Sequence, residues 1–565
     1  MENKMNIQEK IKDWIEETLK IEESFVLAHP KDIKNGDYSF FASPKLANEF
    51  GRALSENKIP EIEKVEVVGS FINFYLSKKF FTESIKEILE KGEECGQTDL
   101  LEGQKIIIEH TQPNPFKEFH IGHLMNNAIG ESVARIIKAN GADVKTASYH
   151  GDKGLHVAKA VWAMNKGIEY EKAYAYGNKA YEEDENTKQE IIALNKTIYD
   201  GKITEIWKIC NDGFNKFKNY FLTICRRLDT TFDYQFWETA SGEVGKKIVL
   251  ENVGKIFENG EGGAVIFKGE NFEPKTHTRV FINSEGLPTY EAKEVGLAKI
   301  KKELFAYNQS ITVTGNEQDS FFDVTEIAIG EVLPELKGKL KHLSHGMLRL
   351  PTGKMSSRTG DVITTESLID QVKEKVREKI AERNLSEEEK EEILEVVAIG
   401  AIKYSILRQA IGGDIIFDFD KSISFEGDSG PYLQYACVRA NSILEKADMS
   451  RLNLDMSEAV FDTWETTELE KYLYRFTEVV ERAGTHSTGS INSLQAGSGQ
   501  VEYAPHHIVT YLTELASIFN SFYAKEKIID PSDGASPYKI ALTQAVAYTL
   551  KSGLRLLGIK VPDKM

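Results

Sequence analysis

Cysteine is scarce in this sequence, and the few cysteines lie far apart. Among 565 residues there are four, namely Cys95, Cys210, Cys225 and Cys437. No CxxC pair occurs, and the nearest two cysteines have fourteen residues between them. Cysteine zinc sites and disulfide frameworks need closer or more numerous cysteines. We therefore expect no structural zinc and four reduced, mostly buried thiols.

Long apolar runs and an excess of positive charge are also missing. No apolar stretch approaches the ~20 residues of a membrane span, which argues against a membrane protein. The beginning, MENKMNIQEKIKDWIEE, lacks the apolar core and the cleavage site of a signal peptide, so we expect a cytoplasmic location. The 70 Lys and Arg against 88 Asp and Glu give a net charge of −18. This argues against a protein that coats nucleic acid non-specifically with a broad basic surface, but it does not exclude a local basic groove.

What the sequence does contain is the composition of a folded protein. Hydrophobic residues make up 41% and charged residues 28%, and the length predicts about three or four domains. At the beginning, Ile7, Ile11, Trp14, Ile15 and Leu19 recur at helical spacing, which predicts an amphipathic helix. A turn entering a strand follows at 35–41, a strand at 65–76, and then a closing helix.

The middle of the chain shows the pattern of a parallel sheet. A buried strand begins at Lys105, a helix ends near Gly141, and another strand covers 143–151. Strand, helix and strand within about 45 residues form a βαβ unit. A long helical stretch over about 153–230 interrupts this pattern, after which strands are predicted at 263–267, 278–283, 310–315 and 339–350. From about 366 onwards nearly every segment has helical spacing.

A four-residue motif, His120-Ile121-Gly122-His123, falls between the first buried strand and its helix. The free N–H groups and the positive dipole end of a helix accept phosphate at such a place. Gly122 lets the backbone approach a ligand closely. The two imidazoles can donate hydrogen bonds to a transferring group. A purely structural turn is the alternative for so short a motif.

A second motif follows 234 residues later within LPTGKMSSRTGD. It consists of Lys354, Met355, Ser356, Ser357 and Arg358. A glycine- and serine-rich loop with two cations can close over a polyphosphate and neutralise developing charge. A solvated basic turn is the alternative for this segment alone. The two motifs on one α/β fold favour nucleotide chemistry.

Together these motifs resemble the HIGH and KMSKS signatures of class I aminoacyl-tRNA synthetases, and the chain is most similar to the arginyl-tRNA synthetase family. The similarity extends from end to end and is carried by IEHTQPNPFKEFHIGHL (108–124), GMLRLPTGKMSSRTGDV (346–362), GPYLQYACVRANSIL (430–444), SGLRLLGIKVPDKM (552–565) and the segments NGDYSFF and GSFINFYL.

The resemblance implies a particular domain order. We expect a small α+β domain that contacts the tRNA elbow over 1–100. A Rossmann-type α/β catalytic domain over 101–365 would carry an insertion at about 153–290. A connecting helical region would cover 366–429, and an all-α anticodon-binding domain would cover 430–565.

An arginine-selective pocket needs carboxylates, because the guanidinium is planar, always charged and rich in donors. The resemblance places an acidic residue after an FD dipeptide, which is Glu238 here. It also implies a Tyr-x-x-x-Asp element, which reads Tyr290 to Glu294 with Glu in place of Asp. Positions i and i+4 share one helix face, so both side chains can line one wall. A solvated Glu294 paired with a lysine is the alternative.

The resemblance extends to the remaining substrate contacts. Glu109 would take the α-ammonium of arginine, and Asn114 would hold its carboxylate or amino group. Gln112 stands where the family often has Ser, so its role is open. Gly151, Asp152 and His156 belong either to the pocket rim or to a structural turn. The full arginine-binding set is Glu109, Gln112, Asn114, His123, Asp152, Glu238, Tyr290, Glu294 and Gln318.

For ATP, the resemblance implies contacts beside the ribose, the adenine and the phosphates. The set is Phe119, His120, Gly122, His123, Gly315, Glu317, His345, Gly346, Met347, Lys354 and Met355.

One departure from the family signature bears on catalysis. Its fourth KMSKS position is often Lys, and here it is Ser357. Lys117, three residues before the HIGH motif, is expected to substitute, since the transition state at the α-phosphate needs a cation. The catalytic set is Lys117, His120, Gly122, His123, Lys354, Ser356, Ser357 and Arg358.

The tRNA-binding residues are expected in both terminal regions. Asn520, Phe522 and Tyr523 in the segment FNSFY, and Tyr435 with Arg439, would stack on or bond to anticodon bases. A core position is the alternative for Phe522. Asn73 and Phe74 would contact the D-loop.

The expected reaction joins L-arginine to the terminal adenosine of tRNA(Arg) through arginyl-adenylate, with ATP as substrate and Mg²⁺ accompanying it. The family usually needs bound tRNA for arginine activation, and we expect a monomer with no membrane partner. A cysteinyl enzyme would need zinc ligands, and glutamyl or glutaminyl enzymes would need a cationic pocket. Small cofactor adenylyltransferases lack the helical domain. A non-catalytic tRNA-binding paralogue remains a further alternative, which an activity assay separates.

Overall fold

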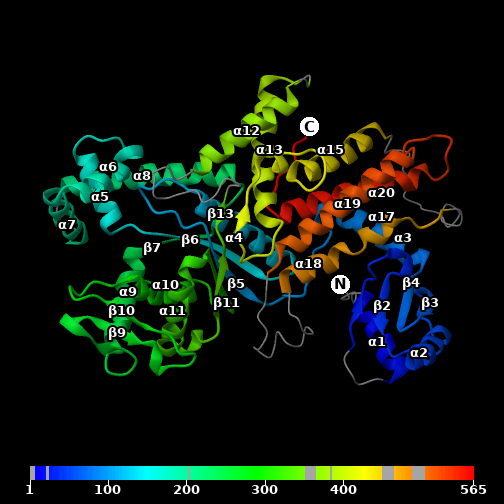
Figure 1. Ribbon diagram of the computed structural model, residues 1–565, viewed down its shortest axis with the longest axis horizontal. Helices are drawn as coiled ribbons and strands as arrows, with labels where there is room; N and C mark the ends of the chain where they lie inside the picture. Colours follow the sequence, from blue (N-terminus) through cyan, green and yellow to red (C-terminus); the bar gives the residue numbers. More distant parts are fainter. Residues whose placement is uncertain are drawn as a thin grey trace. The chain divides into compact units, whose positions relative to one another are not determined.

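The computed structural model describes residues 7–20, 25–200, 204–349, 364–381, 383, 385–447, 464–485 and 503–565. The chain divides into two compact units, whose segments are drawn in Figure 1. The first unit consists of Met1–Gly96, Ala436–Glu478 and Tyr511–Ser552. The second consists of Gln97–Tyr435, Val479–Thr510 and Gly553–Met565. Segments far apart in the sequence therefore share one unit.

The beginning of the chain forms a four-stranded antiparallel sheet in the order β1-β2-β4-β3. Its strands and helices are α1 (Ile7–Leu19), β1 (Leu27–Ala28), β2 (Tyr38–Phe41), α2 (Pro44–Glu56), β3 (Ile62–Val68), β4 (Phe71–Leu76) and α3 (Lys78–Lys91). The expected first helix is confirmed. The single strand expected over 65–76 is instead a hairpin, because the chain reverses at Gly69, whose φ of 63° suits glycine in a tight turn.

A five-stranded parallel sheet lies at the centre of the second unit, in the order β12-β11-β5-β6-β7. Its strands are β5 (Lys105–Glu109), β6 (Asp143–His150), β7 (Tyr234–Trp237), β11 (Gln309–Gly315) and β12 (Leu340–His345). The helix α4 (Ile121–Ala139) connects β5 to β6, which confirms the expected βαβ unit and the α/β class. The isoleucines of β5 are all buried, as is typical of a strand covered on both faces.

The strand order reverses at β5, which pairs with β6 on one side and with β11 on the other. In open parallel sheets, ligands bind outside the carboxyl ends of the strands at such a switch point. The loops after β5 and β11 are therefore the first place to examine for a site.

Helices follow β6, as expected, and are gathered together in Figure 1. They are α5 (Leu155–Asn165), α6 (Tyr170–Glu183), α7 (Glu185–Asp200) and α8 (Thr204–Arg227). The chain then returns to the main sheet through β7, which lies inside the insertion expected at about 153–290. Sequence patterns missed this strand because it has only four residues and ends directly at a helix.

A small antiparallel sheet of order β10-β9-β8 follows. Thus the strands expected at 263–267 and 278–283 exist but do not join the parallel sheet. The elements here are α9 (Glu238–Glu251), β8 (Glu258–Asn259), β9 (Val265–Lys268), β10 (Thr278–Ile282), α10 (Tyr290–Leu304) and α11 (Asp319–Val332).

The later part of the chain is mainly helical, as expected. A pair of two-residue strands, β13 (Leu348–Arg349) and β14 (Ile415–Ile416), interrupts it. The helices are α12 (Thr365–Ile380), α13 (Glu387–Leu407), α14 (Phe419–Ser422), α15 (Gly430–Lys446), α17 (Glu468–Leu473), α18 (Phe476–Thr485), α19 (Pro505–Lys525) and α20 (Ser536–Leu556).

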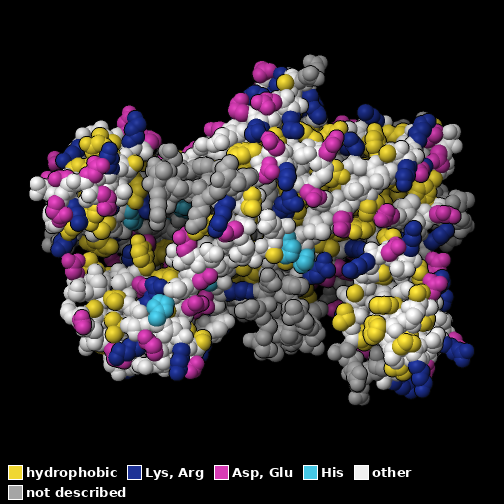
Figure 2. All heavy atoms as spheres, viewed as in Figure 1, with side chains coloured by type: hydrophobic (Ala, Val, Ile, Leu, Met, Phe, Trp, Pro, Cys, Tyr) yellow, Lys and Arg dark blue, Asp and Glu magenta, His cyan; other side chains and the backbone are white. Residues whose placement is uncertain are grey.

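Three expectations from composition can be compared with the structure. The four cysteines are free and buried, as expected. Within the described ranges, no helix has both the length and the apolar character to cross a bilayer. On the face shown in Figure 2, acidic and basic side chains are interspersed, so that face presents no broad basic surface.

Candidate active site

The loop that follows β5 carries the first candidate residues and an unusual backbone. Thr111, Gln112 and Phe116 have positive φ angles of 78°, 38° and 66°. Non-glycine residues adopt this region rarely, and they cluster at sites whose geometry the surrounding structure enforces. Glu109, buried at the end of β5, forms an ion pair with Lys301 at 2.6 Å and accepts a hydrogen bond from the Gln112 amide at 3.0 Å.

The HIGH motif begins α4, where the sequence placed it, and its two imidazoles cap the helix. Nδ1 of His120 accepts from the N–H of Gly122 at 3.1 Å, and Nδ1 of His123 accepts from the N–H of His120 at 3.2 Å. The two rings stack with centroids 3.7 Å apart. With Nδ1 as acceptor, each neutral ring carries its proton on Nε2. Both rings are therefore able to donate from Nε2 to a phosphate.

The protonation state of these rings follows from their surroundings. Burial lowers the pKa of His120, and the nearby Lys117 lowers it further. Burial lowers the pKa of His123 well below its usual value, with added effects from His120, Lys117 and His150. Both rings are therefore neutral near pH 7.

Lys117 is half-buried in the same loop, with Nζ 5.0 Å from the centroid of the Tyr174 ring. Burial lowers the pKa of Lys117, and Lys159 adds to this effect. In the part of the chain that the structure describes, no carboxylate forms an ion pair with Lys117. The loop thus offers a cation beside the HIGH motif.

Buried carboxylates gather at the carboxyl ends of the strands. Glu238 is the first residue of α9, directly after β7, and forms an ion pair with Lys293 of α10 at 2.5 Å. Burial raises the pKa of Glu238. The pKa of Glu294 is raised to about 8, first by burial and then by Glu109. Glu238 adds to that rise, so the three carboxylates influence one another electrostatically.

Tyr149 of β6 belongs to the same cluster, although sequence reasoning missed it. Its hydroxyl and that of Ser241 form a hydrogen bond of 2.7 Å. Burial raises the pKa of Tyr149 well above its usual value, and Glu294 and Glu238 raise it further. Its position near the end of a buried strand, just before Gly151, was the available sequence signal. Lys293 and Lys301 were also missed, although they flank Glu294 on one helix.

The loops after β5 and β6 meet beside Glu238. Asn114 Oδ1 accepts from the N–H of Gly151 at 3.1 Å, and His156 Nε2 lies 3.0 Å from the carbonyl of Gly151. Asp152 Oδ1 accepts from the N–H of Thr239 at 2.9 Å. The structure thus brings these residues together. The same contacts also fit the alternative of a structural turn.

Tyr290 and Glu294 lie one turn apart on α10, as the sequence predicted. Tyr290 is 61% exposed, and Lys293 Nζ is 4.8 Å from the centroid of its ring. The alternative of a solvated Glu294 is disfavoured by the buried surroundings that raise the pKa of this carboxyl.

The nucleotide candidates lie at the other side of the switch point. Gly315 ends β11 and pairs in register with His345, which ends β12. His345 Nε2 contacts Asn126 Oδ1 at 2.5 Å, and the Asn126 amide donates to Gln112 at 3.2 Å. Asn126, one turn after the HIGH motif on α4, was not predicted, and it connects the end of β12 with the loop after β5.

The remaining nucleotide candidates that the structure describes follow β11 and β12 or lie next to the HIGH motif. Glu317 and Gln318 form an exposed single turn after β11. Gly346 follows β12, and the N–H of Met347 donates to Asp414 at 2.8 Å. Phe119 is fully buried next to the HIGH motif, 5.2 Å from the His123 ring. The KMSKS-like residues fall outside the described part of the chain, namely Lys354, Met355, Ser356, Ser357 and Arg358.

Two of the expected tRNA contacts need correction. Asn73 is 3% exposed and Phe74 is fully buried, and Phe74 packs against Trp14 and Phe40 in the core of the first unit. Side chains enclosed in this way cannot reach an RNA base. Asn73 and Phe74 are neighbours on β4, so they point to opposite faces of the sheet, yet both faces are covered at this place.

Three of the expected anticodon contacts do come together. Arg439 donates to Asn520 Oδ1 at 2.6 Å and lies 5.3 Å from the centroid of the Tyr523 ring. Tyr523 is 46% exposed. Phe522 is buried, which agrees with the alternative of a core position. Tyr435, on the same helix as Arg439, packs edge to face on Phe425 at 6.4 Å.

Comparisons with known proteins agree with this arrangement. Three family models match: the class I (R) tRNA synthetase catalytic domain over 84–419, the DALR anticodon binding domain over 433–565, and the arginyl tRNA synthetase N-terminal domain over 5–76.

Individual proteins match over nearly their whole length. An arginine–tRNA ligase of Borrelia hermsii is 30% identical over 98% of this chain and 96% of its own. One of Thermococcus kodakarensis is 29% identical over 94% of each chain. The solved arginyl-tRNA synthetase of Thermus thermophilus has a TM-score of 0.76 at 22% identity, covering 99% of this chain and all of its own, which shows the same fold.

Proposed function

The chain belongs to the class I arginyl-tRNA synthetases, and on that premise we propose that it activates L-arginine with ATP and transfers the arginyl group to the terminal adenosine of tRNA(Arg). The observation that carries the proposal is the cluster of Glu109, Glu238 and Glu294 beside the HIGH motif. Paired carboxylates recognise a guanidinium, whereas a pocket for an acidic or amide substrate would need the opposite charge.

The charge balance of the cluster supports a cationic substrate. Three carboxylates face two lysines, because Lys293 pairs with Glu238 and Lys301 pairs with Glu109. Glu294 remains as the carboxylate without an ion pair among the described residues. A bound guanidinium would favour the ionised form of Glu294 and pair with it. We assign Glu294 and Glu238 to the guanidinium, with Tyr290 beside them.

The remaining arginine contacts are assigned around the α-carbon. Glu109 would take the α-ammonium, and Asn114 would hold the carboxylate. Gln112, Asp152 and His123 would border this part of the site. Gln318 would reach it from the turn after β11.

In the first step, the arginine carboxylate attacks the α-phosphorus of ATP, the bond to the β-phosphate oxygen breaks, and pyrophosphate leaves. Catalysis of this kind rests on positioning and on stabilising the developing charge. His120 and His123 would donate from Nε2 to the phosphates, and Lys117 would supply a cation to the α-phosphate. In the second step, the 2′-hydroxyl of the terminal adenosine attacks the arginyl carbonyl and AMP leaves.

The nucleotide would lie over the ends of β11 and β12. Gly315 and Glu317 would border the ribose, and His345, Gly346 and Met347 would frame the adenine. Gly122 would allow a close approach of the phosphates. The polyphosphate would be covered by the KMSKS-like residues Lys354, Met355, Ser356, Ser357 and Arg358.

Mg²⁺ would enter as a companion of ATP. This cation is commonly bound through substrate phosphates and water, with few protein ligands. The described residues contain no group of three or more His, Cys, Asp or Glu arranged to hold a metal. The chain's own contribution would therefore be to orient the phosphates.

For the tRNA, we propose that Arg439, Asn520 and Tyr523 form a contact surface for anticodon bases, with Tyr435 nearby on α15. An exposed tyrosine ring under a guanidinium suits stacking on an unpaired base. We also propose that the protein acts as a monomer in the cytoplasm. Its domain boundaries are proposed near residues 100, 365 and 430.

The test is ATP–pyrophosphate exchange with each of the twenty amino acids, with and without unfractionated tRNA. We expect exchange with arginine alone, and only when tRNA is present. Exchange with another amino acid would overturn the proposed pocket but leave the fold untouched. No exchange in the presence of cognate tRNA would favour a non-catalytic tRNA-binding protein.

A further inference from the structure

Helix α8 ends in a tight C-terminal cap just before the strand that leads to Glu238. The N–H of Thr230 donates to the carbonyl of Cys225 at 2.9 Å, and the N–H of Asp229 donates to that of Arg226 at 3.2 Å. Asp229 has a φ of 54°. This is the pattern of a Schellman cap. It leaves the carbonyl of Leu228 facing away from its own helix, where it needs another donor.

The last turn of α20 ends in the same way. The N–H of Ile559 donates to the carbonyl of Leu554 at 2.8 Å, and the N–H of Gly558 donates to that of Arg555 at 3.0 Å. Gly558 has a φ of 66°. Two helix C-termini thus present carbonyl groups, and both belong to the second unit.

One fully buried side chain joins these two caps. Lys403 of α13 is 0% exposed, and its Nζ donates to the carbonyl of Leu228 at 2.6 Å and to that of Gly558 at 2.7 Å. Helix C-termini favour a positive partner. Burial lowers the pKa of Lys403 to about 7. Both the ammonium and the amine carry two or more N–H bonds, so both forms can bridge two carbonyls.

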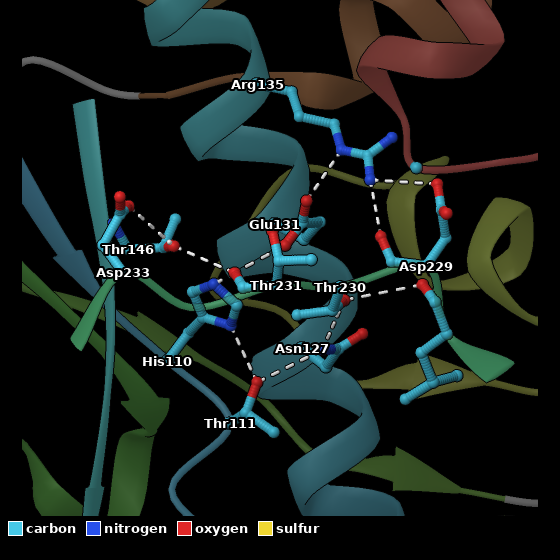
Figure 3. Close-up of polar contacts among 12 residues, drawn as sticks. His110, Thr111, Asn127, Glu131, Arg135, Thr146, Asp229, Thr230, Thr231 and Asp233 are labelled. Atoms are coloured by element: carbon cyan, nitrogen blue, oxygen red, sulfur yellow. Dashed lines mark hydrogen bonds and ion pairs between the residues drawn. The ribbon is translucent and has the colours of Figure 1, made fainter. Parts of the chain in front are cut away.

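A second cation supports the same two caps from the HIGH helix. Arg135 donates to the carbonyl of Asp229 at 2.6 Å and to that of Arg555 at 2.9 Å, and it is anchored on Glu131 at 2.8 Å. Figure 3 shows Arg135 between Glu131 and Asp229. The turn after α8 is therefore held by α4 and α13 together.

From this turn, buried hydrogen bonds reach the candidate pocket. The Asn127 amide of α4 donates to Thr230 at 2.9 Å and to Thr111 at 3.2 Å, as drawn in Figure 3. Thr111 is two residues after Glu109, and Thr230 precedes β7 and Glu238. Through Asn127 the turn is therefore connected to the segment that follows Glu109, and along the chain it leads into β7, which ends next to Glu238.

We propose that Lys403 is a positioning residue for the arginine pocket. By joining the C-terminal caps of α8 and α20, it fixes the Leu228–Thr230 turn and through it the direction of β7 and the place of Glu238. It touches no substrate. The inference rests on the proposed function, because it assigns Glu238 to the guanidinium.

The experiment measures arginine and ATP KM values in tRNA-supported exchange, using the full chain and Lys403→Met. Methionine keeps most of the length of the side chain but has no N–H group to donate. We expect KM for arginine to rise about tenfold, equal to about 1.4 kcal/mol, while KM for ATP stays within about twofold because β11 and β12 lie across the sheet. Lys390→Met is the matched control, since Lys390 lies on the same helix and pairs with the exposed Glu387.

Unchanged KM values, or equal rises in both, would overturn the inference. If Lys403→Met does not fold, Thr230→Val decides, because it keeps the shape and removes the Asn127 contact. A selective rise in the arginine KM supports the proposal, and an unchanged arginine KM contradicts it. Failure of the proposed function would show differently, as no arginine-dependent exchange in the unsubstituted protein.

Discussion

The side-chain oxygen of Asn114 accepts a hydrogen bond from the main-chain N–H of Gly151 at 3.1 Å. This contact joins the loop after β5 to the loop after β6 at the carboxyl edge of the sheet. Glu238 reaches the same point from β7, because a Cβ added at Gly151 would lie 3.0 Å from Glu238 Oε1. Three neighbouring strands therefore converge on one small volume.

Gly151→Ala is expected to damage arginine binding without unfolding the protein. The new Cβ would lie 2.8 Å from Asn114 Oδ1, closer than real Cβ contacts, so the side chains assigned to arginine must move. We expect a rise of tenfold or more in KM for arginine, about 1.4 kcal/mol. Gly534→Ala is the control, since a Cβ there meets open space. Equal KM values in both variants would refute the assignment.

Removing the charge of Glu294 is expected to weaken arginine selectively. A charge-assisted hydrogen bond contributes about 1.5–3 kcal/mol, which corresponds to roughly 10- to 100-fold in KM. The measurement compares Glu294→Gln and Glu238→Gln with Glu243→Gln. Glu243 is an exposed residue of the helix that begins at Glu238. An arginine KM in Glu294→Gln that equals that of the control would remove Glu294 from the pocket.

Arginine affinity is expected to depend on pH through Glu294. In the empty pocket the pKa of this carboxyl is about 8, so it is largely protonated at pH 7. A bound guanidinium favours the ionised form and lowers this pKa, and binding therefore releases a proton. Affinity should rise by up to about tenfold per pH unit towards pH 8 and level off above it.

Calorimetry in two buffers of different ionisation enthalpy would count the released proton. Glu294→Gln should bind arginine more weakly and without this release. A pH-independent affinity in the unsubstituted protein would show that Glu294 does not ionise on binding.

Lys117→Ala is expected to reduce adenylate formation while the fold stays intact. Lys117 forms no ion pair among the described residues, so its removal leaves no salt-bridge partner unpaired. Removing a group that stabilises transition-state charge costs about 10²–10³ in rate. Pre-steady-state adenylate formation would measure it, with the exposed Lys172→Ala as control. A near-normal rate would assign the cation to another residue.

Acid should destabilise the second unit through its buried histidines. Burial lowers the pKa of His110 to about 4, against an ordinary value of about 6.5. Between these values the unfolded chain binds more protons, so stability is lost as pH falls from 6.5 towards 4. The contribution of His110 lost by pH 5 is about 2 kcal/mol.

Melting temperatures at pH 7 and pH 5 would reveal this effect. His110→Gln should have a lower melting temperature at pH 7, because its buried contact with Thr111 changes. Its melting temperature should, however, fall less on acidification. An equal loss in both proteins would show that His110 does not titrate as its burial implies.

Local sequence was a sound guide wherever one segment makes its own structure. The isoleucine run of β5, the helix starting at the HIGH motif and the glycine after α4 all have a short-range physical cause, and the structure agrees. The single strand expected over 65–76 was wrong because the turn at Gly69 is a local detail inside one apolar pattern. β7 was missed because four residues carry too little periodicity.

The site shows the same division. Glu238, Glu294, Asn114 and Lys117 were predicted because motif similarity points to positions in a chain, and their roles stay predictions. Tyr149, Asn126 and Lys293 were missed because their relevance comes from neighbours distant in sequence. Asn73 and Phe74 were wrongly expected to be accessible to RNA, since a motif does not show that both faces of its strand are covered.

The sequence by itself determined the parallel α/β class, the family resemblance and the residue types that suit arginine and ATP, because periodicity and motif spacing are properties of the chain alone. Tertiary structure decided how charge is distributed in the pocket: which carboxylates pair with lysines, why the pKa of Glu294 rises, and how Lys403 joins two distant helix ends. Burial and Coulomb interaction depend on distances through space, and only the folded chain sets those distances.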